Sequence, residues 1–442
     1  MQRHLSSKLE QWKKSPRRKP LLLLGARQVG KTWLMRDFGA SQYKQVAYIR
    51  FDRNERMRQV FSESSYDMKE LLLNIQMQVG FKITPEDTLI VLDEIQECPA
   101  ALTSLKYFCE DLPEYHVMAA GSLLGVQLHE GTGFPVGKVN TLVLYPMSYR
   151  EFLIAMGHEL DAELLAQGDW GRIRLFADRF AYLLRLYYYV GGMPEAVSTF
   201  VETHDFSAVR DVQNEILSHY ANDFSKHVPK SLASKLSLLW ESVPHQLARE
   251  NKRFMYKDVQ KGMRSRDLED AMDWLRRAGL IHLVYRVNAS ALPLSAYRDG
   301  AFKIYMLDVG LLGAKSGLSA SVLTDKSAVF REFKGALAEQ FVQQQLRAEC
   351  GIEPHYWQND SARSEIDFVF QSDRDVVPVE VKAETNTKAK SLLLYCRQFQ
   401  PRIAVRCSMN DYSCQPLPYG INTTLVDLPL YAVSQMNQVT QE

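Results

Sequence analysis

The sequence predicts an α/β protein: a parallel-sheet domain comes first, a mostly helical region follows, and a second α/β domain ends the chain. Three observations support this prediction. Four leucines at 21–24 lead into a glycine-containing loop, strand and helix patterns alternate after it, and a helix pattern at 335–346 is followed by strand patterns at 365–370 and 376–382. Because 442 residues are too many for one core, about three domains are expected.

The glycine-containing loop has the pattern of a phosphate-binding loop. Its sequence GARQVGKT fits G-x-x-x-x-G-K-[ST] and follows a predicted buried strand. Glycines let backbone N–H groups face a triphosphate, and the start of the next helix adds its positive end. Lys31 is expected to reach the β and γ phosphates, and the Thr32 hydroxyl to bind Mg²⁺. The residues predicted to hold ATP are Gly25, Ala26, Arg27, Gln28, Val29, Gly30, Lys31 and Thr32.

A second nucleotide-related segment is the strand pattern at 88–94 (TLIVLDE), which ends in two carboxylates. We expect Asp93 to hold Mg²⁺, directly or through water, and Glu94 to activate the attacking water. Ser122 follows the next predicted strand, at 116–120. Since ligands bind beyond the carboxyl ends of parallel strands, Ser122 is either a sensor of the γ-phosphate or an ordinary turn serine.

The remaining patterns of this part complete a parallel sheet. Strands are predicted at 46–52 and 142–144, and helices at 67–79 and 101–112. Ser148 and Glu151 have the spacing of a capping box that opens a further helix. Strands that alternate with helices imply a sheet covered on both faces.

In the middle of the chain, the sequence predicts a helical region followed by a winged helix. Residues 152–226 carry few strand signals, and their aromatic cluster at 187–189 suits a core. Residues 232–308 fit a winged helix, with helices at 232–247, 256–261 and 267–277 and wing strands at 280–287 and 302–307. Nine basic residues favour DNA contact here, although winged helices also bind proteins. They are Arg249, Lys252, Arg253, Lys257, Lys261, Arg264, Arg266, Arg276 and Arg277, of which Arg264 and Arg266 would enter first.

The last domain holds a cluster of acidic residues and a lysine. A helix is predicted at 335–346 with Glu339, and strands at 365–370 with Asp367 and at 376–382 with Glu380 and Lys382. Side chains two apart on a strand share a face, so Glu380 and Lys382 point the same way. If Asp367 faces them, carboxylate oxygens could bind Mg²⁺ beside a lysine that activates water. The alternative is a solvated charge cluster.

Several separated segments resemble a known family. GARQVGKT, LDEIQECP, AAGSLLG, PVGKV followed by LYPMSYREFL, and VGGMPEAV are similar to bacterial and archaeal ATPases that join an AAA-type domain to a carboxyl-terminal domain of unknown function. The resemblance implies nucleotide roles for Lys31, Thr32, Asp93 and Glu94, and extends to Ser122. No arginine matches the finger that such enzymes borrow from a neighbouring subunit. Arg150 is a candidate, but an arginine in a capped helix needs no function.

The D…E-x-K arrangement after the helix with Glu339 resembles the PD-(D/E)xK nuclease fold of restriction endonucleases and Holliday-junction resolvases. The sequence departs from that pattern at Ile366, where a proline often precedes the first acid. The predicted fold class is thus a P-loop NTPase sheet domain, a helical and winged-helix middle, and a PD-(D/E)xK nuclease-like α/β end. The predicted domains are residues 1–151, 152–227, 228–325 and 326–442.

Composition adds little about partners. The net charge is +1, and the basic residues among 1–19 either contact nucleic acid or keep a helix solvated. Six cysteines without metal-like spacing suit a reducing cytoplasm, and no apolar run is long enough to span a bilayer.

Two functions remain open after the sequence analysis. The chain is either a Mg²⁺-dependent ATPase that acts on DNA through its winged-helix and nuclease-like parts, or a nucleotide-controlled switch whose carboxyl-terminal domain binds a protein without cutting. A homo-oligomer is one option for either function.

Overall fold

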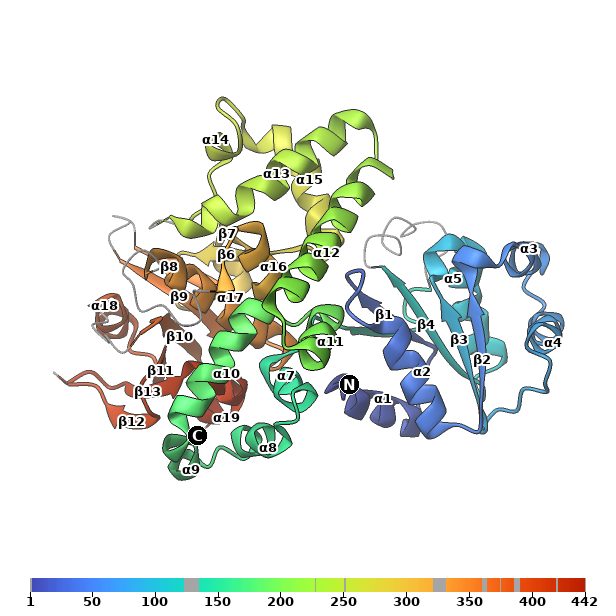
Figure 1. The fold of residues 1–442 in the computed structure, drawn as a ribbon, viewed down its shortest axis with the longest axis horizontal. Coiled ribbons are helices and arrows are strands. Elements are labelled where there is room, and N and C mark those ends of the chain that lie inside the picture. The colour runs from blue at the N-terminus through green and yellow to red at the C-terminus, as the bar shows by residue number, and fades with distance from the viewer. Residues whose placement is uncertain are drawn as a thin grey trace. The chain divides into compact units, whose positions relative to one another are not determined.

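The computed structural model describes residues 2–122, 135–226, 228–249, 252–320, 331–359, 364–373, 375–384, 390–418 and 420–441. It divides into two compact units (Figure 1). Residues 2–145 and the short segment 277–280 form the amino-terminal unit, and residues 146–276 with 281–442 form the carboxyl-terminal unit. The first predicted domain ends at residue 151, whereas this unit ends at 145. The predicted divisions at 227 and 325 fall inside the carboxyl-terminal unit.

The amino-terminal unit contains a five-stranded parallel sheet in the order β2-β3-β4-β1-β5. Its strands are β1 (Leu21–Gly25), β2 (Gln45–Arg50), β3 (Thr88–Asp93), β4 (His116–Ser122) and β5 (Asn140–Val143). Its helices are α1 (Leu5–Lys14), α2 (Lys31–Gln42), α3 (Glu55–Glu63), α4 (Met68–Val79) and α5 (Pro99–Asp111). All the strands and helices predicted for this part are confirmed, and so is the parallel sheet.

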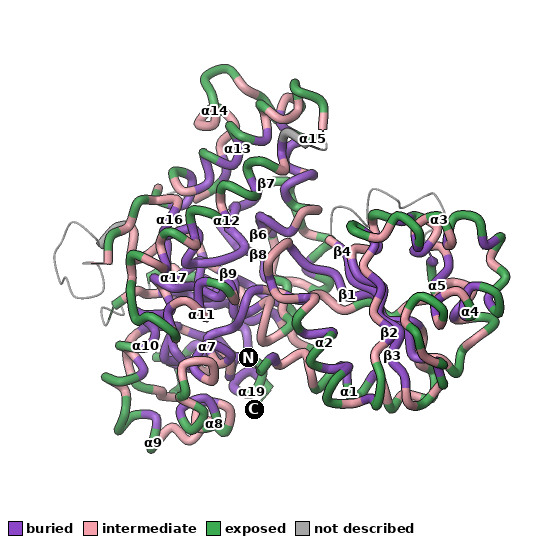
Figure 2. Tube along the Cα trace, turned by 45° about the vertical axis from the view of Figure 1, so that its right-hand side comes forward, coloured by how far each residue is buried: buried purple, intermediate pink, exposed green. Residues whose placement is uncertain are grey.

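The sheet is buried on both faces, as the four-leucine run predicts. Leu22 and Leu24 pack in one core with apolar residues of α3, α4 and α5. Leu21 and Leu23 are also buried, and α2 packs along β1 to β4. Figure 2 shows the buried residues following the strands of this sheet. Burial on both faces explains why the strands read as continuous apolar runs without alternation.

The carboxyl-terminal unit begins with helices. They are α7 (Tyr149–Ala155), α8 (Glu159–Gln167), α9 (Trp170–Leu175), α10 (Ala177–Val190), α11 (Pro194–Thr203), α12 (Phe206–Lys226), α13 (Lys230–Ala248), α14 (Tyr256–Val259) and α15 (Ser265–Arg277). The predicted capping box is present, since Ser148 accepts from the Glu151 N–H and Glu151 accepts from the Ser148 N–H. Tyr187 of the aromatic cluster is fully buried and donates to the Met147 carbonyl at 2.5 Å, so the cluster is core as predicted.

An eight-stranded mixed sheet follows, in the order β12-β13-β11-β10-β9-β8-β6-β7. Its strands are β6 (Ile281–Val287), β7 (Arg298–Met306), β8 (His355–Gln358), β9 (Glu365–Gln371), β10 (Val376–Val381), β11 (Ile403–Ser408), β12 (Ser413–Pro416) and β13 (Thr424–Pro429). The remaining helices are α16 (Val309–Lys315), α17 (Arg331–Ala348), α18 (Lys390–Phe399) and α19 (Met436–Gln441).

This sheet joins two parts that the sequence separates. The antiparallel strands β6 and β7 correspond to the two segments for which wing strands were predicted, and β6 pairs in parallel with β8 of the predicted nuclease-like domain. Val287 and Leu294 also belong to the core formed by β8, β9 and α18. The helices and strands of residues 232–308 therefore exist as predicted, but they share a sheet and a core with the last domain.

The glycines of VGGMPEAV belong to a close backbone crossing within the carboxyl-terminal unit. Gly191 has φ 75° and ψ −165°, a conformation that is essentially restricted to glycine. A Cβ on Gly192 would lie 2.1 Å from the Met147 carbonyl oxygen. The Gly192 N–H donates to the buried carboxylate of Asp308 at 2.6 Å. These glycines are thus explained by packing.

Candidate functional site

The loop between β1 and α2 has the backbone that the phosphate-loop pattern predicts. Gly30 caps α2 in the left-handed conformation, with φ 96°, and Gln28 also has a positive φ of 65°. Gly25 has a different reason to be glycine, because a Cβ there would lie 2.4 Å from the Leu144 carbonyl oxygen. The loop thus leads straight into the amino terminus of a 12-residue helix, where backbone N–H groups and the helix dipole favour an anion.

Lys31 lies buried against the loop. Its ammonium donates to the carbonyls of Gly25 at 3.0 Å and Ala26 at 2.8 Å. Burial lowers the pKa of Lys31 to about 8, while the nearby carboxylates of Glu94 and Asp93 act in the opposite direction. A lysine that is held this way is charged at neutral pH and can exchange its carbonyl partners for phosphate oxygens.

The structure brings Thr32 and Asp93 together, although they lie 61 residues apart in the chain. The Thr32 hydroxyl donates to Asp93 Oδ2 at 2.8 Å. The Tyr48 hydroxyl on β2 donates to the same oxygen at 2.6 Å, and the Glu94 N–H donates to Oδ1 at 3.0 Å. Tyr48 was not predicted, because only the sheet order shows that β2 lies beside β3.

Glu94 follows β3 with a backbone that few residues adopt. Its φ is 52° and its ψ 46°, a left-handed conformation that costs a non-glycine residue about 1 kcal/mol or more. The Gln96 side-chain amide donates to Glu94 Oε2 at 2.6 Å and fixes the carboxylate. Strain of this kind is common at functional sites.

Ser122 ends β4, the strand that lies between β1 and β3. In the pairing register it is opposite Gly25, the first residue of the phosphate loop. The predicted sensor therefore lies at the same edge of the sheet as the loop and Asp93. This position suits either a γ-phosphate sensor or a turn residue.

Arg3 contacts the phosphate loop, although the sequence around Arg3 does not predict such a contact. Its guanidinium is buried and donates to the carbonyls of Val29 at 2.9 Å and Tyr145 at 2.6 Å. The basic residues of 1–19 were predicted as an arm that contacts nucleic acid or stays solvated, and Arg3 does neither.

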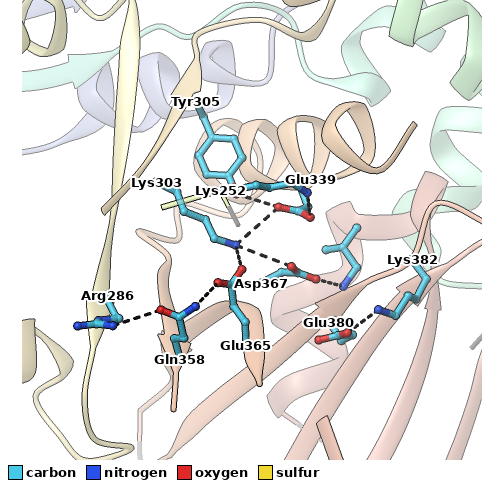
Figure 3. Close-up of polar contacts among 11 residues, drawn as sticks. Lys252, Arg286, Lys303, Tyr305, Glu339, Gln358, Glu365, Asp367, Glu380 and Lys382 are labelled. Carbon is cyan, nitrogen blue, oxygen red and sulfur yellow. Dashed lines mark hydrogen bonds and ion pairs between the residues drawn. The ribbon is translucent and has the colours of Figure 1, made fainter. Parts of the chain in front are cut away.

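The residues of the predicted nuclease site also meet, within the carboxyl-terminal unit. Lys382 Nζ lies 2.6 Å from Glu380 Oε1, and the Val381 N–H donates to Asp367 Oδ2 at 2.8 Å. Glu339, on α17, is buried and accepts from the Tyr305 hydroxyl at 3.2 Å. Lys252, Lys303 and Glu365, which the predicted site did not include, also belong to this cluster (Figure 3).

Three family models match separate parts of the chain. Residues 17–153 match the model described as an AAA domain. Residues 181–322 and 334–431 match two domains of unknown function, DUF8612 and DUF4143. The first match covers the sheet and the loop described above. The amino-terminal unit is therefore an AAA-type domain.

Several solved structures align with much of the chain at low identity. A Walker-type ATPase of Pyrococcus abyssi is 14% identical over 70% of this chain and 94% of its own, with a TM-score of 0.42. The Aeropyrum pernix ORC1 protein in complex with DNA is 12% identical over 72% and 93%, with a TM-score of 0.32. AMPPCP-bound DnaA from Aquifex aeolicus is 14% identical over 62% and 84%, with a TM-score of 0.26. No curated protein matches the chain.

Arg150 and some of the basic residues that were predicted to contact DNA form ion pairs within the carboxyl-terminal unit. Arg150, the candidate finger, lies 2.7 Å from Glu349 Oε1 in an ion pair. Among the nine basic residues at 249–277, Arg249 pairs with Asp258 and Lys252 with Glu339. Six others are exposed: Arg253, Lys257, Lys261, Arg264, Arg266 and Arg276. Of these, Arg266 pairs with Asp267 and Arg276 with Asp273. Among the described helices, none is both long and apolar enough to cross a bilayer.

Proposed function

We propose that this protein binds and hydrolyses ATP with Mg²⁺ in its AAA-type domain. The observation that carries the proposal is the 2.8 Å hydrogen bond between the Thr32 hydroxyl and the Asp93 carboxylate, directly beside the phosphate loop. Hydroxyl and carboxylate oxygens are the hard ligands that Mg²⁺ prefers, so this donor set fits the ion. When bound, Mg²⁺ would neutralise charge on the β and γ phosphates.

The roles of the residues follow from their positions. Loop N–H groups and the Lys31 ammonium would hold the phosphates, while Tyr48 and the Glu94 N–H keep Asp93 oriented. Glu94, fixed by Gln96, would accept a proton from the attacking water. Ser122 would contact the γ-phosphate from the end of β4.

A pair of matched substitutions tests hydrolysis. Glu94→Gln should keep nucleotide binding and lower kcat by about 10²- to 10³-fold, because the base is lost while the shape is kept. Glu97→Gln makes the same change three residues away at an exposed position and should leave kcat unchanged. Lys31→Ala should lose triphosphate binding. Normal turnover of Glu94→Gln or Lys31→Ala would remove that residue from the mechanism.

We further propose that the carboxyl-terminal unit contacts DNA through the predicted winged helix. The support is the set of exposed basic residues near the start of α15, Arg264 and Arg266 among them. The double variant Arg264→Glu with Arg266→Glu should weaken DNA binding. It should also reduce by about two the slope of the logarithm of the binding constant against the logarithm of the salt concentration. Arg174→Glu with Arg185→Glu reverses two exposed arginines elsewhere in the same unit and should leave the slope intact. Equal slopes for the two double variants would contradict DNA contact at this surface.

The second candidate is a nucleotide-controlled switch whose carboxyl-terminal unit binds a protein and cuts nothing. The observation that favours it is the presence of three lysines inside the predicted nuclease cluster. The two candidates differ in one measurement, since DNA should raise ATP turnover only under the first. Sedimentation with and without ATP would show whether a homo-oligomer forms.

A further inference from the structure

The acid cluster of the carboxyl-terminal unit already contains a cation. Lys303 extends from β7, and its side chain is fully buried. Its ammonium lies 2.5 Å from Glu365 Oε1, 3.8 Å from Glu339 Oε2 and 3.9 Å from Asp367 Oδ1. Its Nζ also lies 5.0 Å from the centre of the Tyr356 ring. Figure 3 shows this ammonium pointing in among the carboxylates.

Two more lysines complete the balance of charge. Lys252 pairs with Glu339, and Lys382 pairs with Glu380. Four carboxylates, Glu339, Glu365, Asp367 and Glu380, thus face three ammonium groups, Lys252, Lys303 and Lys382. Burial and the neighbours Glu339 and Glu380 also raise the pKa of Asp367 well above its usual range, which favours its neutral form. The chain's own ammonium groups therefore balance most of the negative charge of this cluster.

The geometry does not suit a divalent metal. Mg²⁺ needs several oxygens at about 2.0–2.1 Å in an octahedron, including waters. Over the residues that the structure describes, no three Asp, Glu, His or Cys side chains are placed to hold a metal ion. The point close to Glu339, Glu365 and Asp367 is taken by Lys303 Nζ. Expelling that ammonium would leave a buried charge without its partners, which is costly.

We propose that Lys303 occupies the place of the divalent cation, so that the predicted nuclease cluster is a structural, metal-independent charge cluster without cutting activity. The chain then has acidic residues arranged as in a nuclease site, but the ammonium group of Lys303 neutralises their charge in place of a metal ion. The resemblance to PD-(D/E)xK nucleases then concerns fold and not chemistry. This inference is independent of ATP hydrolysis in the AAA-type domain.

The experiment measures Mn²⁺ binding to the full chain by electron paramagnetic resonance without nucleotide. All proteins carry Asp93→Asn, so that the ATP site contributes no bound ion. We expect the parent and its Asp367→Asn variant to bind Mn²⁺ equally weakly, because the Lys303 ammonium already lies among these carboxylates. Bound Mn²⁺ in the parent that Asp367→Asn removes, or Mn²⁺-dependent nicking of DNA that it removes, would overturn the proposal.

A second variant tests the role of the lysine itself. Lys303→Met keeps an unbranched side chain of similar shape but removes the ammonium group, so the freed carboxylates should bind Mn²⁺ at least tenfold more tightly than the parent. Mn²⁺ should also raise the melting temperature of this variant only. Lys315→Met is the control, because Lys315 is a poorly exposed lysine that pairs with Glu241 away from the cluster. A folded Lys303→Met that binds no Mn²⁺ would contradict the proposal, and if this variant does not fold, the Asp367→Asn comparison decides alone.

Discussion

ATP affinity should fall as pH rises above about 8, because Lys31 loses its charge in the free protein. Burial lowers the pKa of this ammonium to about 8, whereas the usual lysine value is 10.5. A bound triphosphate stabilises the ammonium, so the pKa of Lys31 in the complex must lie higher. Well below pH 8 both states are protonated and the affinity is constant. Above pH 8 binding takes up a proton and becomes weaker.

The size of the effect follows from the fraction of charged Lys31. With a pKa of about 8, this fraction is about nine-tenths at pH 7, one-half at pH 8 and one-tenth at pH 9. If only the charged form binds, Kd should rise about tenfold between pH 7 and pH 9. At pH 8.5 each binding event should take up about 0.8 proton. The same shift affects folding, since the free energy of unfolding should increase as pH rises from about 8 to 10.5.

Two measurements check this prediction. Titration of a fluorescent ATP analogue at fixed ionic strength gives Kd from pH 7 to pH 9, and calorimetry in two buffers of different ionisation enthalpy gives the protons taken up. Lys31→Arg stays charged throughout this range, so its Kd should not change with pH even if it is weaker overall. A flat Kd for the native protein, or no proton uptake at pH 8.5, would refute this account of Lys31.

Three further predictions concern other parts of the chain. Tyr48→Phe removes a hydrogen bond to Asp93 and should raise the Mg²⁺ concentration for half-maximal ATPase activity about three- to tenfold. The control Tyr43→Phe removes a hydrogen bond to His116 and should leave that concentration unchanged. The same Mg²⁺ dependence in both variants would argue against a role of Tyr48 in orienting Asp93. Gly192→Ala should lower the free energy of unfolding by about 3 kcal/mol in urea titrations, because its Cβ would meet a backbone carbonyl. Gly335→Ala, in an open helical position, should be neutral or stabilising by up to about 1 kcal/mol. If both variants lost the same free energy of unfolding, the clash at Gly192 could not be the cause. Asp367→Asn should gain stability relative to the native protein as pH rises above about 4. The reason is that a raised pKa makes the native protein lose stability as the unfolded aspartate ionises above its usual 3.8. A stability difference that does not change with pH would contradict the raised pKa.

The sequence predicted the features that neighbouring residues determine. The four leucines, the loop that ends in Lys31 and Thr32, and the capping box at Ser148 all depend on residues within a few positions of one another. Local patterns of this kind are decided by backbone geometry and helix ends, which the sequence shows directly. The meeting of Thr32 with Asp93 was also predicted, because parallel strands bring their carboxyl ends to one edge.

The features that escaped prediction depend on which strands become neighbours. Tyr48 reaches Asp93 only because β2 pairs with β3, and Lys303 reaches Asp367 only because β6 and β7 extend the sheet of β9. A lysine between apolar residues in the strand of residues 302–307 was a usable signal, since a buried lysine needs an acidic partner. Arg3 gave no signal of this kind.

The shared sheet also limits how the proposed ATP turnover could act on the carboxyl-terminal unit. β6 pairs with β8 through Arg286 and Val287, and the Tyr395 hydroxyl of α18 donates to Ser290 at 2.7 Å. Moving the predicted winged helix separately from the last domain would break this pairing and expose the core around Val287. A rigid-body motion leaves those contacts intact and costs far less. Any nucleotide-driven movement should therefore displace residues 228–320 and 331–441 together, so that a DNA or protein partner bound by one part is carried by both.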